Sequence, residues 1–432
     1  MGLNTTVPNI LEPIVLSAYD SAGTLNFNNQ EQASETQSLG FSDNPTTAEA
    51  GRKGGTAKTL AKRLAAKTNG KLGGRPKKGA AAAAASHTVH YEDIAINRTT
   101  WGTFSPDRMV QFTDDIFRYY RQAGFPYYKL TADERQKEFG KLLACDYTTL
   151  ISEDVVKQTM HGLKLAWSYH PHSWSVQCGT MLTPVQVFRD DTLFRKAIAK
   201  RIAYGDNISD SAIRKVLRTF SGTQSVSNFR PTAAATIYHH LLPEGGGTVY
   251  DPSAGFGGRL LGAMTCTRVQ KYIATDPSTA SWQGCQQMAD ELNSHGIPIQ
   301  LVNCGSENFR PDPESIDLAF SSPPYFDTEK YSDEHTQSFA KFGSREEWLN
   351  GFMKRTLTNC HYGLKTTGLL AINIANVKSY PKLEDDFVEL AAACGFRLVR
   401  TLKLALSVMM GTRQVGGAKF KYEPIFVFQK AL

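Results

Sequence analysis

A short β-branched and apolar run, Thr248–Tyr250, leads into Asp251-Pro252-Ser253-Ala254-Gly255-Phe256-Gly257-Gly258-Arg259, and an apolar helical segment starts near Leu260. Glycines let the backbone turn sharply and approach a ligand closely, while a helix N-terminus presents free N–H groups. Asp276 follows the next expected strand, where a carboxylate can accept hydrogen bonds from two ribose hydroxyls. This combination predicts a nucleoside-cofactor site. A glycine pair alone is often only a turn, and the third glycine of a dinucleotide fingerprint is missing.

A second motif follows the run Ile316–Phe320 and reads Ser321-Ser322-Pro323-Pro324-Tyr325-Phe326. Two consecutive prolines fix the backbone and remove two amide donors, which leaves carbonyls that only accept. The Ser322 hydroxyl and the Pro323 carbonyl are suited to accept the N–H bonds of an exocyclic amine and to aim its lone pair at a methyl donor. Tyr325 offers a face on which a base can stack. The alternative interpretation is a proline-rich turn beside a core tyrosine.

The chain after Asn228 alternates short apolar runs with helical stretches, which predicts a mostly parallel sheet with helices on both faces. The expected strands are 248–250, 271–275, 299–302, 316–320 and 368–374. The last two segments, 396–406 and 422–429, are joined by a glycine-rich loop at 411–417 and predict an antiparallel hairpin. The expected fold class is therefore α/β.

Composition divides the chain into four parts. Residues 1–50 are polar with little apolar periodicity and predict a disordered tail. Residues 51–86 form a basic arm rich in Gly, Lys and Ala, and residues 87–220 predict a mainly helical domain with helices at 107–122, 133–143 and 192–202. Residues 221–432 hold both motifs and are interpreted as the catalytic domain.

Charge, cysteine content and hydropathy limit the class of protein. The 432 residues carry a net charge of +7, which is compatible with a polyanionic partner. The seven cysteines are scattered without metal-ligand spacing, so no metal site is expected. No apolar run approaches the roughly 20 residues that span a bilayer. We expect an intracellular protein, cytoplasmic or nucleoid-associated, without a membrane partner.

The two motifs resemble those of the DNA amino-methyltransferases, which act on cytosine N4 or adenine N6. Ser253 and Phe256 replace the Phe and Ser of the family's glycine motif, and the resemblance covers about 200 residues. It implies the S-adenosylmethionine-dependent methyltransferase fold and S-adenosyl-L-methionine as cofactor. The cofactor contacts that it implies are Phe229, Thr232, Asp251, Pro252, Ala254, Gly255, Gly257, Asp276 and Ser306, and the catalytic residues are Ser322, Pro323, Pro324 and Tyr325.

Two further segments resemble parts of this family. Asn228-Phe229-Arg230-Pro231-Thr232 is similar to its additional cofactor motif, although a plain helix start explains Pro231 and Thr232 equally well. Lys421-Tyr422-Glu423-Pro424-Ile425 resembles its closing strand. The serine at the start of the Pro-Pro motif is typical of the cytosine-N4 branch. The resemblance therefore implies a DNA methyltransferase with cytosine N4 favoured over adenine N6.

The expected partner is double-stranded DNA, from which the target base is flipped out. The basic arm contains a Gly-Arg-Pro core with Arg75, Lys77 and Lys78, and it looks like an AT-hook that fits a narrow minor groove. A merely basic linker is the alternative. Base recognition is expected from the N-terminal half, from 326–348 or from 411–421. Other functions left open are amino-methylation of RNA or of a protein glutamine, and non-catalytic DNA binding by a degenerate methyltransferase fold.

Overall fold

The computed structural model describes residues 88–205, 207–406 and 421–431, all within the second of two units of the chain, Thr59–Leu432. The expected tail, the basic arm with Arg75, Lys77 and Lys78, and the loop 411–417 lie outside the described residues. Those interpretations stay predictions.

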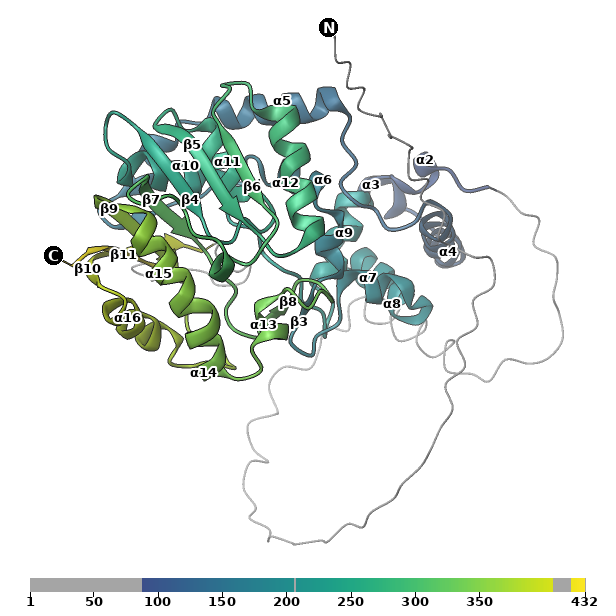
Figure 1. Ribbon diagram of the computed structural model, residues 1–432. Coiled ribbons are helices and arrows are strands. Elements are labelled where there is room, and N and C mark those ends of the chain that lie inside the picture. The colour runs from purple at the N-terminus through teal and green to yellow at the C-terminus, as the bar shows by residue number, and fades with distance from the viewer. Residues whose placement is uncertain (1–87, 206, 407–420, 432) are drawn as a thin grey trace, which may run out of the picture. The chain divides into compact units, whose positions relative to one another are not determined.

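A nine-stranded sheet with the order β1-β2-β10-β11-β9-β7-β4-β5-β6 forms the centre of the described chain (Figure 1). Strands β6, β5, β4, β7 and β9 pair in parallel, whereas β11 is antiparallel to both β9 and β10. The seven strands of the C-terminal half are β4 Gly247–Asp251, β5 Val269–Thr275, β6 Ile299–Val302, β7 Ile316–Ser321, β9 Leu364–Asn373, β10 Phe396–Ala405 and β11 Tyr422–Lys430.

Counted from β4, this half of the sheet has the order 3-2-1-4-5-7-6 with the seventh strand reversed. That is the arrangement of the S-adenosylmethionine-dependent methyltransferase fold. The expected α/β fold class is confirmed, including the antiparallel hairpin that closes the sheet.

Neighbouring strand residues point to opposite sides of the sheet, so apolar side chains occupy both faces. Helices cover both of these faces. Val249 belongs to one apolar core and Tyr250 to the other, and both are fully buried. The first face carries α10 Pro231–Leu241, α11 Gly258–Thr265 and α12 Thr279–Leu292. The second carries η4 Trp348–Met353, α15 Lys354–Gly363 and α16 Leu383–Ala393, and shorter elements are η3 Ser306–Asn308, β8 Glu329–Lys330, α13 Ser338–Lys341 and α14 Arg345–Glu347.

Part of the N-terminal half has an apolar core of its own. Its longest helix, α4 Pro106–Ala123, begins where the Ser105 hydroxyl accepts a hydrogen bond from the Arg108 N–H, and it ends at Gly124, whose φ is 80°. The helix expected at 107–122 therefore lies where it was predicted. The other helices of this core are α2 Tyr91–Ile94, α3 Arg98–Trp101, α7 Pro184–Arg189, α8 Asp191–Ala203 and α9 Asp210–Arg218.

The segment between these helices packs on the sheet instead. Phe139 and Leu165 belong to the core of the first sheet face, and Val155 pairs in parallel with Lys403 of β10. An Arg135–Glu291 ion pair of 2.8 Å adds a contact with α12. Residues on both sides of the boundary that we expected between 220 and 221 therefore share one core, and the division into domains stays a prediction. The elements involved are α5 Ala132–Leu143, η1 Tyr147–Leu150, β1 Ile151–Ser152, β2 Val155–Val156 and α6 Leu163–Tyr169. Of the two elements that follow, η2 Pro171–Ser175 contributes Trp174 to the N-terminal core, and β3 Gln177–Cys178 pairs with β8 in a separate two-stranded sheet.

Candidate functional site

The glycine turn between β4 and α11 is built from three glycines with different surroundings. Gly255 and Gly257 have φ angles of 58° and 72°, in the left-handed region that favours glycine. A Cβ on Gly257 would lie 2.7 Å from Met288, and one on Gly258 would collide with the Phe229 carbonyl. A Cβ on Gly255 would meet nothing closer than 3.9 Å. Gly255 is thus the position where the turn leaves open space.

Asp251 is the last residue of β4, and its side chain is buried in the interior of the protein. Its carboxylate accepts hydrogen bonds from the Arg259 guanidinium at 2.8 Å, the Tyr272 hydroxyl at 2.7 Å and the Ser321 hydroxyl at 2.8 Å. Burial would lower the pKa of Arg259, but the adjacent Asp251 carboxylate raises it above its ordinary value. Asp251 is 0% exposed and does not line the cavity described below. This carboxylate therefore connects β4 with α11, β5 and β7, and the cofactor contact expected of Asp251 stays a prediction.

Asp276, after β5, faces the glycine turn. One carboxylate oxygen accepts the Gly255 N–H at 2.7 Å and the other accepts the Ser278 N–H at 2.9 Å. Burial raises the pKa of Asp276 to about 7, against these two hydrogen bonds, which lower it. A carboxylate has about four lone-pair sites, so two remain for a ligand's hydroxyl groups. The position of Asp276 is compatible with the expected contact with the ribose of the cofactor, and that contact stays a prediction.

The Pro-Pro motif leaves the end of β7, next to the glycine turn. Ser321 is anchored to Asp251, and Phe326 has a φ of 58°, uncommon for a residue with a side chain. The Phe326 ring packs against Trp348 and Tyr380, which hold this reversal of the chain. Ser322, Pro323, Pro324 and Tyr325 are thereby presented at the carboxyl end of the parallel strands, where ligands of α/β sheets bind.

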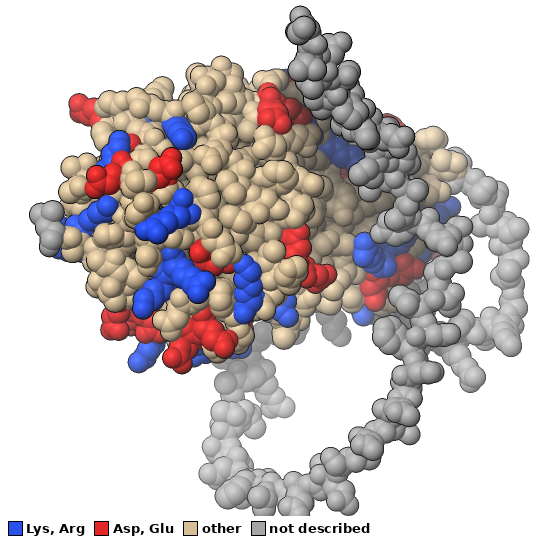
Figure 2. All heavy atoms as spheres, in the orientation of Figure 1, with Lys and Arg blue, Asp and Glu red and all other residues tan. Residues whose placement is uncertain are grey.

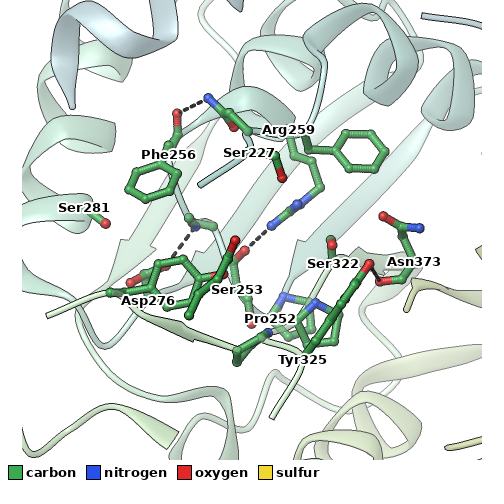
Figure 3. Close-up of a pocket in the computed structure, with 18 of the residues that line it drawn as sticks. Ser227, Pro252, Ser253, Phe256, Arg259, Asp276, Ser281, Ser322, Tyr325 and Asn373 are labelled. Carbon is green, nitrogen blue, oxygen red and sulfur yellow. Dashed lines mark hydrogen bonds between the residues drawn. The ribbon is translucent and has the colours of Figure 1, made fainter. Parts of the chain in front are cut away.

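Tyr325 is held by its hydroxyl group. The hydroxyl lies 3.3 Å from the Asn373 carbonyl oxygen (Figure 3). It also lies 3.4 Å from a carboxylate oxygen of Glu423. Burial raises the pKa of Tyr325 well above its ordinary value, and the Glu423 charge adds to this effect, whereas the Ser322 hydroxyl lowers it. Because the hydroxyl is anchored at β9 and β11, the ring has a fixed orientation beside the Pro-Pro backbone.

Both motifs line one cavity of about 300 Å³ (Figure 3). Among the predicted residues, Thr232, Asp251 and Gly257 do not line it. The Thr232 hydroxyl, buried in the first turn of α10, instead accepts the Thr159 N–H at 3.1 Å, and Gly257 packs against Met288. The predicted residues that do line the cavity are Phe229, Pro252, Ala254, Gly255, Asp276, Ser306, Ser322, Pro323, Pro324 and Tyr325.

Three acidic residues of the cavity wall are not among the predicted site residues: Glu307, which follows the predicted contact Ser306, and Glu329 and Glu423. Glu307 forms an ion pair with Lys341 at 2.6 Å. No described cation forms an ion pair with Glu329 or Glu423, and burial raises the pKa of both. The signal for Glu423 was its place as a lone acid at the start of an apolar strand, and Glu329 lies in the segment where base recognition was expected.

Two further findings concern the described residues as a whole. They contain no group of three or more His, Cys, Asp or Glu side chains that could hold a metal ion. None of their helices is long and apolar enough to cross a membrane.

Comparisons with known proteins find matches among solved structures alone. No family model and no curated protein matches the chain. Solved structures that match include the magnesium protoporphyrin IX methyltransferase of Synechocystis (15% identity, TM-score 0.32, 46% of this chain and 79% of that chain). Others are an S-adenosylmethionine-dependent O-methyltransferase of Thermotoga maritima (13%, 0.32, 48% and 68%) and TYW2 of M. jannaschii (10%, 0.30, 46% and 74%). Because these TM-scores lie below 0.5, the fold class rests on the strand order.

Proposed function

We propose that the chain is an S-adenosyl-L-methionine-dependent methyltransferase that modifies the exocyclic amino group of a DNA base, with cytosine N4 favoured over adenine N6. One observation carries the proposal: Gly255 and Asp276, from the glycine turn and the second strand, line the same cavity as the Ser-Pro-Pro-Tyr motif. A methyl donor and an amine held at these two motifs would share one enclosed space. Direct methyl transfer needs that proximity.

The residues on the glycine side fit the cofactor. Gly255 leaves open space where any side chain would project, and Asp276 has acceptor sites for ribose hydroxyls. Phe229 and Ser306 line the same side of the cavity. When bound, S-adenosylmethionine supplies an electrophilic methyl group on a sulfonium sulfur.

The residues on the proline side suit the amine. Ser322 and the Pro323 carbonyl are acceptors for its two N–H bonds, and accepting them would shift electron density from the ring toward the nitrogen lone pair. Tyr325, anchored through its hydroxyl, offers a ring on which the base can stack. The methylated nitrogen is cationic and can release its proton to water. A target base in duplex DNA would first have to be flipped out of the stack.

DNA is favoured as the substrate by the family resemblance and by the basic arm with Arg75, Lys77 and Lys78. On the face shown in Figure 2, basic and acidic side chains are interspersed, so the charge of this face does not by itself define a nucleic-acid surface. RNA and protein glutamine remain the alternative substrates, because a similar Pro-Pro-aromatic motif serves their methylation. Non-catalytic DNA binding is the remaining alternative.

Digesting host DNA to nucleosides after expression of the full chain, with detection by mass spectrometry, tests the proposal. N4-methylcytosine is expected, and Ser322→Ala provides the control for methylation by host enzymes. N6-methyladenine would change the base but keep the mechanism. Methylation found only in RNA or protein would overturn the DNA substrate, and cofactor binding without any methylated product would favour a non-catalytic protein.

The cofactor site has its own test in Gly255→Leu. The new side chain would occupy the open space and should abolish S-adenosylmethionine binding measured by calorimetry. Because a left-handed backbone costs a residue with a side chain about 1–2 kcal/mol, the folded state should survive. Gly296→Leu, at a left-handed position (φ 66°) in open space outside the cavity lining, is the matched control and should bind normally. Unchanged affinity of Gly255→Leu would refute the assignment.

A further inference from the structure

Glu423 brings a carboxyl group from the C-terminal hairpin to the proline side of the cavity. It lies on β11, opposite Leu404 of β10, and it lines the cavity together with Ser322 and Tyr325. One of its carboxylate oxygens is 3.4 Å from the Tyr325 hydroxyl, which in turn lies 3.3 Å from the Asn373 carbonyl oxygen. The carboxyl group therefore lies beside the acceptors that we assign to the target amine.

The surroundings of Glu423 favour its neutral form. Its titratable neighbours are Tyr325, from the loop after β7, and Glu329 of β8, while β9 and β10 contribute the neutral side chains of Asn373 and Leu404. Burial raises the pKa of Glu423, although hydrogen bonds with Asn373 and Tyr325 lower it. Burial also raises the pKa of Glu329, and the Glu423 charge adds to it.

No cation of the cavity wall compensates this pair of acids. The described cationic side chains that line the cavity are Arg230 and Arg259. Arg259 is committed to Asp251, and Arg230 is not among the groups that shift the pKa of Glu329 or Glu423. Two carboxyl groups that share a site without a cation cannot both stay ionised cheaply. A protonated Glu423 has an O–H group to donate, and this donor needs a partner once a base fills the cavity and excludes water.

The chemistry of the bases supplies that partner. In cytosine and adenine, the exocyclic amine is attached next to a ring nitrogen that only accepts a hydrogen bond. In guanine, the ring nitrogen on the Watson–Crick side of the amine carries a hydrogen. A neutral carboxyl group is thus complementary to the first two bases, while a carboxylate would favour a neighbouring N–H.

We propose that Glu423 is a specificity-determining residue, which in its protonated form donates a hydrogen bond to the ring nitrogen beside the target amine. The proposal rests on the proposed function. Ser322 and the Pro323 carbonyl then bind the amine, and Glu423 binds the adjoining ring nitrogen of the same base. Reading the Watson–Crick edge of an extruded base in this way requires only groups that already line the cavity.

The competing explanation is that Glu423 only positions Tyr325 through their hydrogen bond. The two roles differ in what the substrate contributes. A positioning residue acts whatever the base carries at its ring nitrogen, whereas a recognition residue loses its partner when that nitrogen is replaced by C–H. Substrate analogues combined with variants therefore separate the two roles.

The experiment uses the full chain and a duplex with the target site, mapped by sequencing DNA methylated in cells. The target base is cytosine in one duplex and 3-deazacytosine in the other. If the digest shows N6-methyladenine, the compared bases are adenine and 1-deazaadenine. Initial rates of methyl transfer give kcat/KM for the wild type, Glu423→Gln, Glu423→Leu and the exposed control Glu244→Gln. Gln keeps a donor of similar size, and Leu removes it.

We expect Glu423→Leu to lose about tenfold or more in kcat/KM on the natural base, a loss typical of an unsatisfied buried group. On the deaza base, the wild type and Glu423→Leu should differ by less than about twofold, since the hydrogen bond is already absent. At low pH Glu423→Gln should lose clearly less than Glu423→Leu because it keeps a donor, and Glu244→Gln should stay near the wild type. As the pH rises and Glu423 ionises, the wild type should lose activity while Glu423→Gln keeps it.

Two results would overturn the proposal while the enzyme remains active. Equal losses of Glu423→Leu on both bases would make Glu423 a positioning residue for Tyr325. A loss in Glu423→Gln as large as that in Glu423→Leu would exclude hydrogen-bond donation. If the wild type methylated neither base, the proposed function would fail as well, so the two failures are distinguishable.

Discussion

Two sets of acids differ in how they are compensated: Asp251, fully buried behind the glycine turn, and Glu329 and Glu423, partly buried in the cavity wall. On the glycine side, Asp251 has a guanidinium, two hydroxyls and a backbone N–H for partners. On the proline side, Glu329 and Glu423 have hydroxyl and amide partners but no described cation. A carboxylate whose charge and lone pairs are all matched by protein groups stabilises the fold, whereas one without a cation keeps acceptor or donor capacity for a ligand. Three substitutions and one titration test this contrast.

The largest effect is expected for Asp251→Asn. The variant leaves the Arg259 guanidinium, 4% exposed, without its counter-charge, and breaking a buried ion pair costs about 3–5 kcal/mol. Chemical denaturation should show this loss in the free energy of unfolding. Asp191→Asn removes a partner from a pair whose acid side chain is 70% exposed and should cost less than about 1 kcal/mol. Equal losses would contradict the structural role of Asp251.

Ser322→Ala comes next and acts on the opposite half. Removing an acceptor that works in the transition state should lower kcat by about 10²–10³-fold, as the loss of a single oxyanion-hole donor does elsewhere. S-adenosylmethionine affinity, measured by calorimetry, and stability should hardly change. Ser315→Ala, on an exposed turn, serves as the control. A wild-type kcat in Ser322→Ala would mean that this serine has no catalytic part.

Features of the fold and site that depend on local stretches of chain could be predicted from the sequence. The seven strands of the C-terminal half and the helices α4, α5 and α8 were predictable, because hydrophobic period and capping residues act locally. Ser-Pro-Pro-Tyr and Gly255 could be placed in one site, since the carboxyl ends of adjacent parallel strands meet at one edge. These features depend on short stretches of chain.

The remaining features depend on partners far apart in the sequence. Whether Asp251 faces a ligand or the interior is decided by Arg259, Tyr272 and Ser321, which come from three other elements. The two-residue strands β1 and β2 are too short for any periodicity to reveal their pairing with β10. Glu423 lies in a segment that resembled the closing strand, but its place in the cavity depends on the register of β11 with β9 and β10.

A smaller effect is expected from Tyr325. Tyr325→Ala should raise the KM for DNA and lower kcat/KM by about 1–3 kcal/mol in free-energy terms, the usual value of a base-stacking aromatic. Tyr325→Phe keeps the ring but removes the hydroxyl that contacts Asn373 and Glu423, so its loss should be smaller. Tyr204→Phe, on an exposed tyrosine, is the control. Equal losses in the Ala and Phe variants would show that the hydroxyl matters and the stacking face does not.

The smallest effect concerns the pH dependence of cofactor affinity through Asp276. Its pKa of about 7 means that the ligand-free carboxyl is mostly protonated at pH 6 and mostly ionised at pH 8. Ribose hydroxyls donate better to the ionised form, so affinity should increase as the pH rises through 7. The ionised fraction grows about tenfold over these two pH units, which sets the upper limit of the change in Kd. Asp276→Asn should bind more weakly and keep only the pH dependence of the ligand's own groups. If calorimetric titrations at several pH values gave the same pH dependence of Kd for both proteins, Asp276 would not belong to the cofactor site. The remaining described carboxylate on the glycine side of the cavity wall would then be Glu307, which already pairs with Lys341.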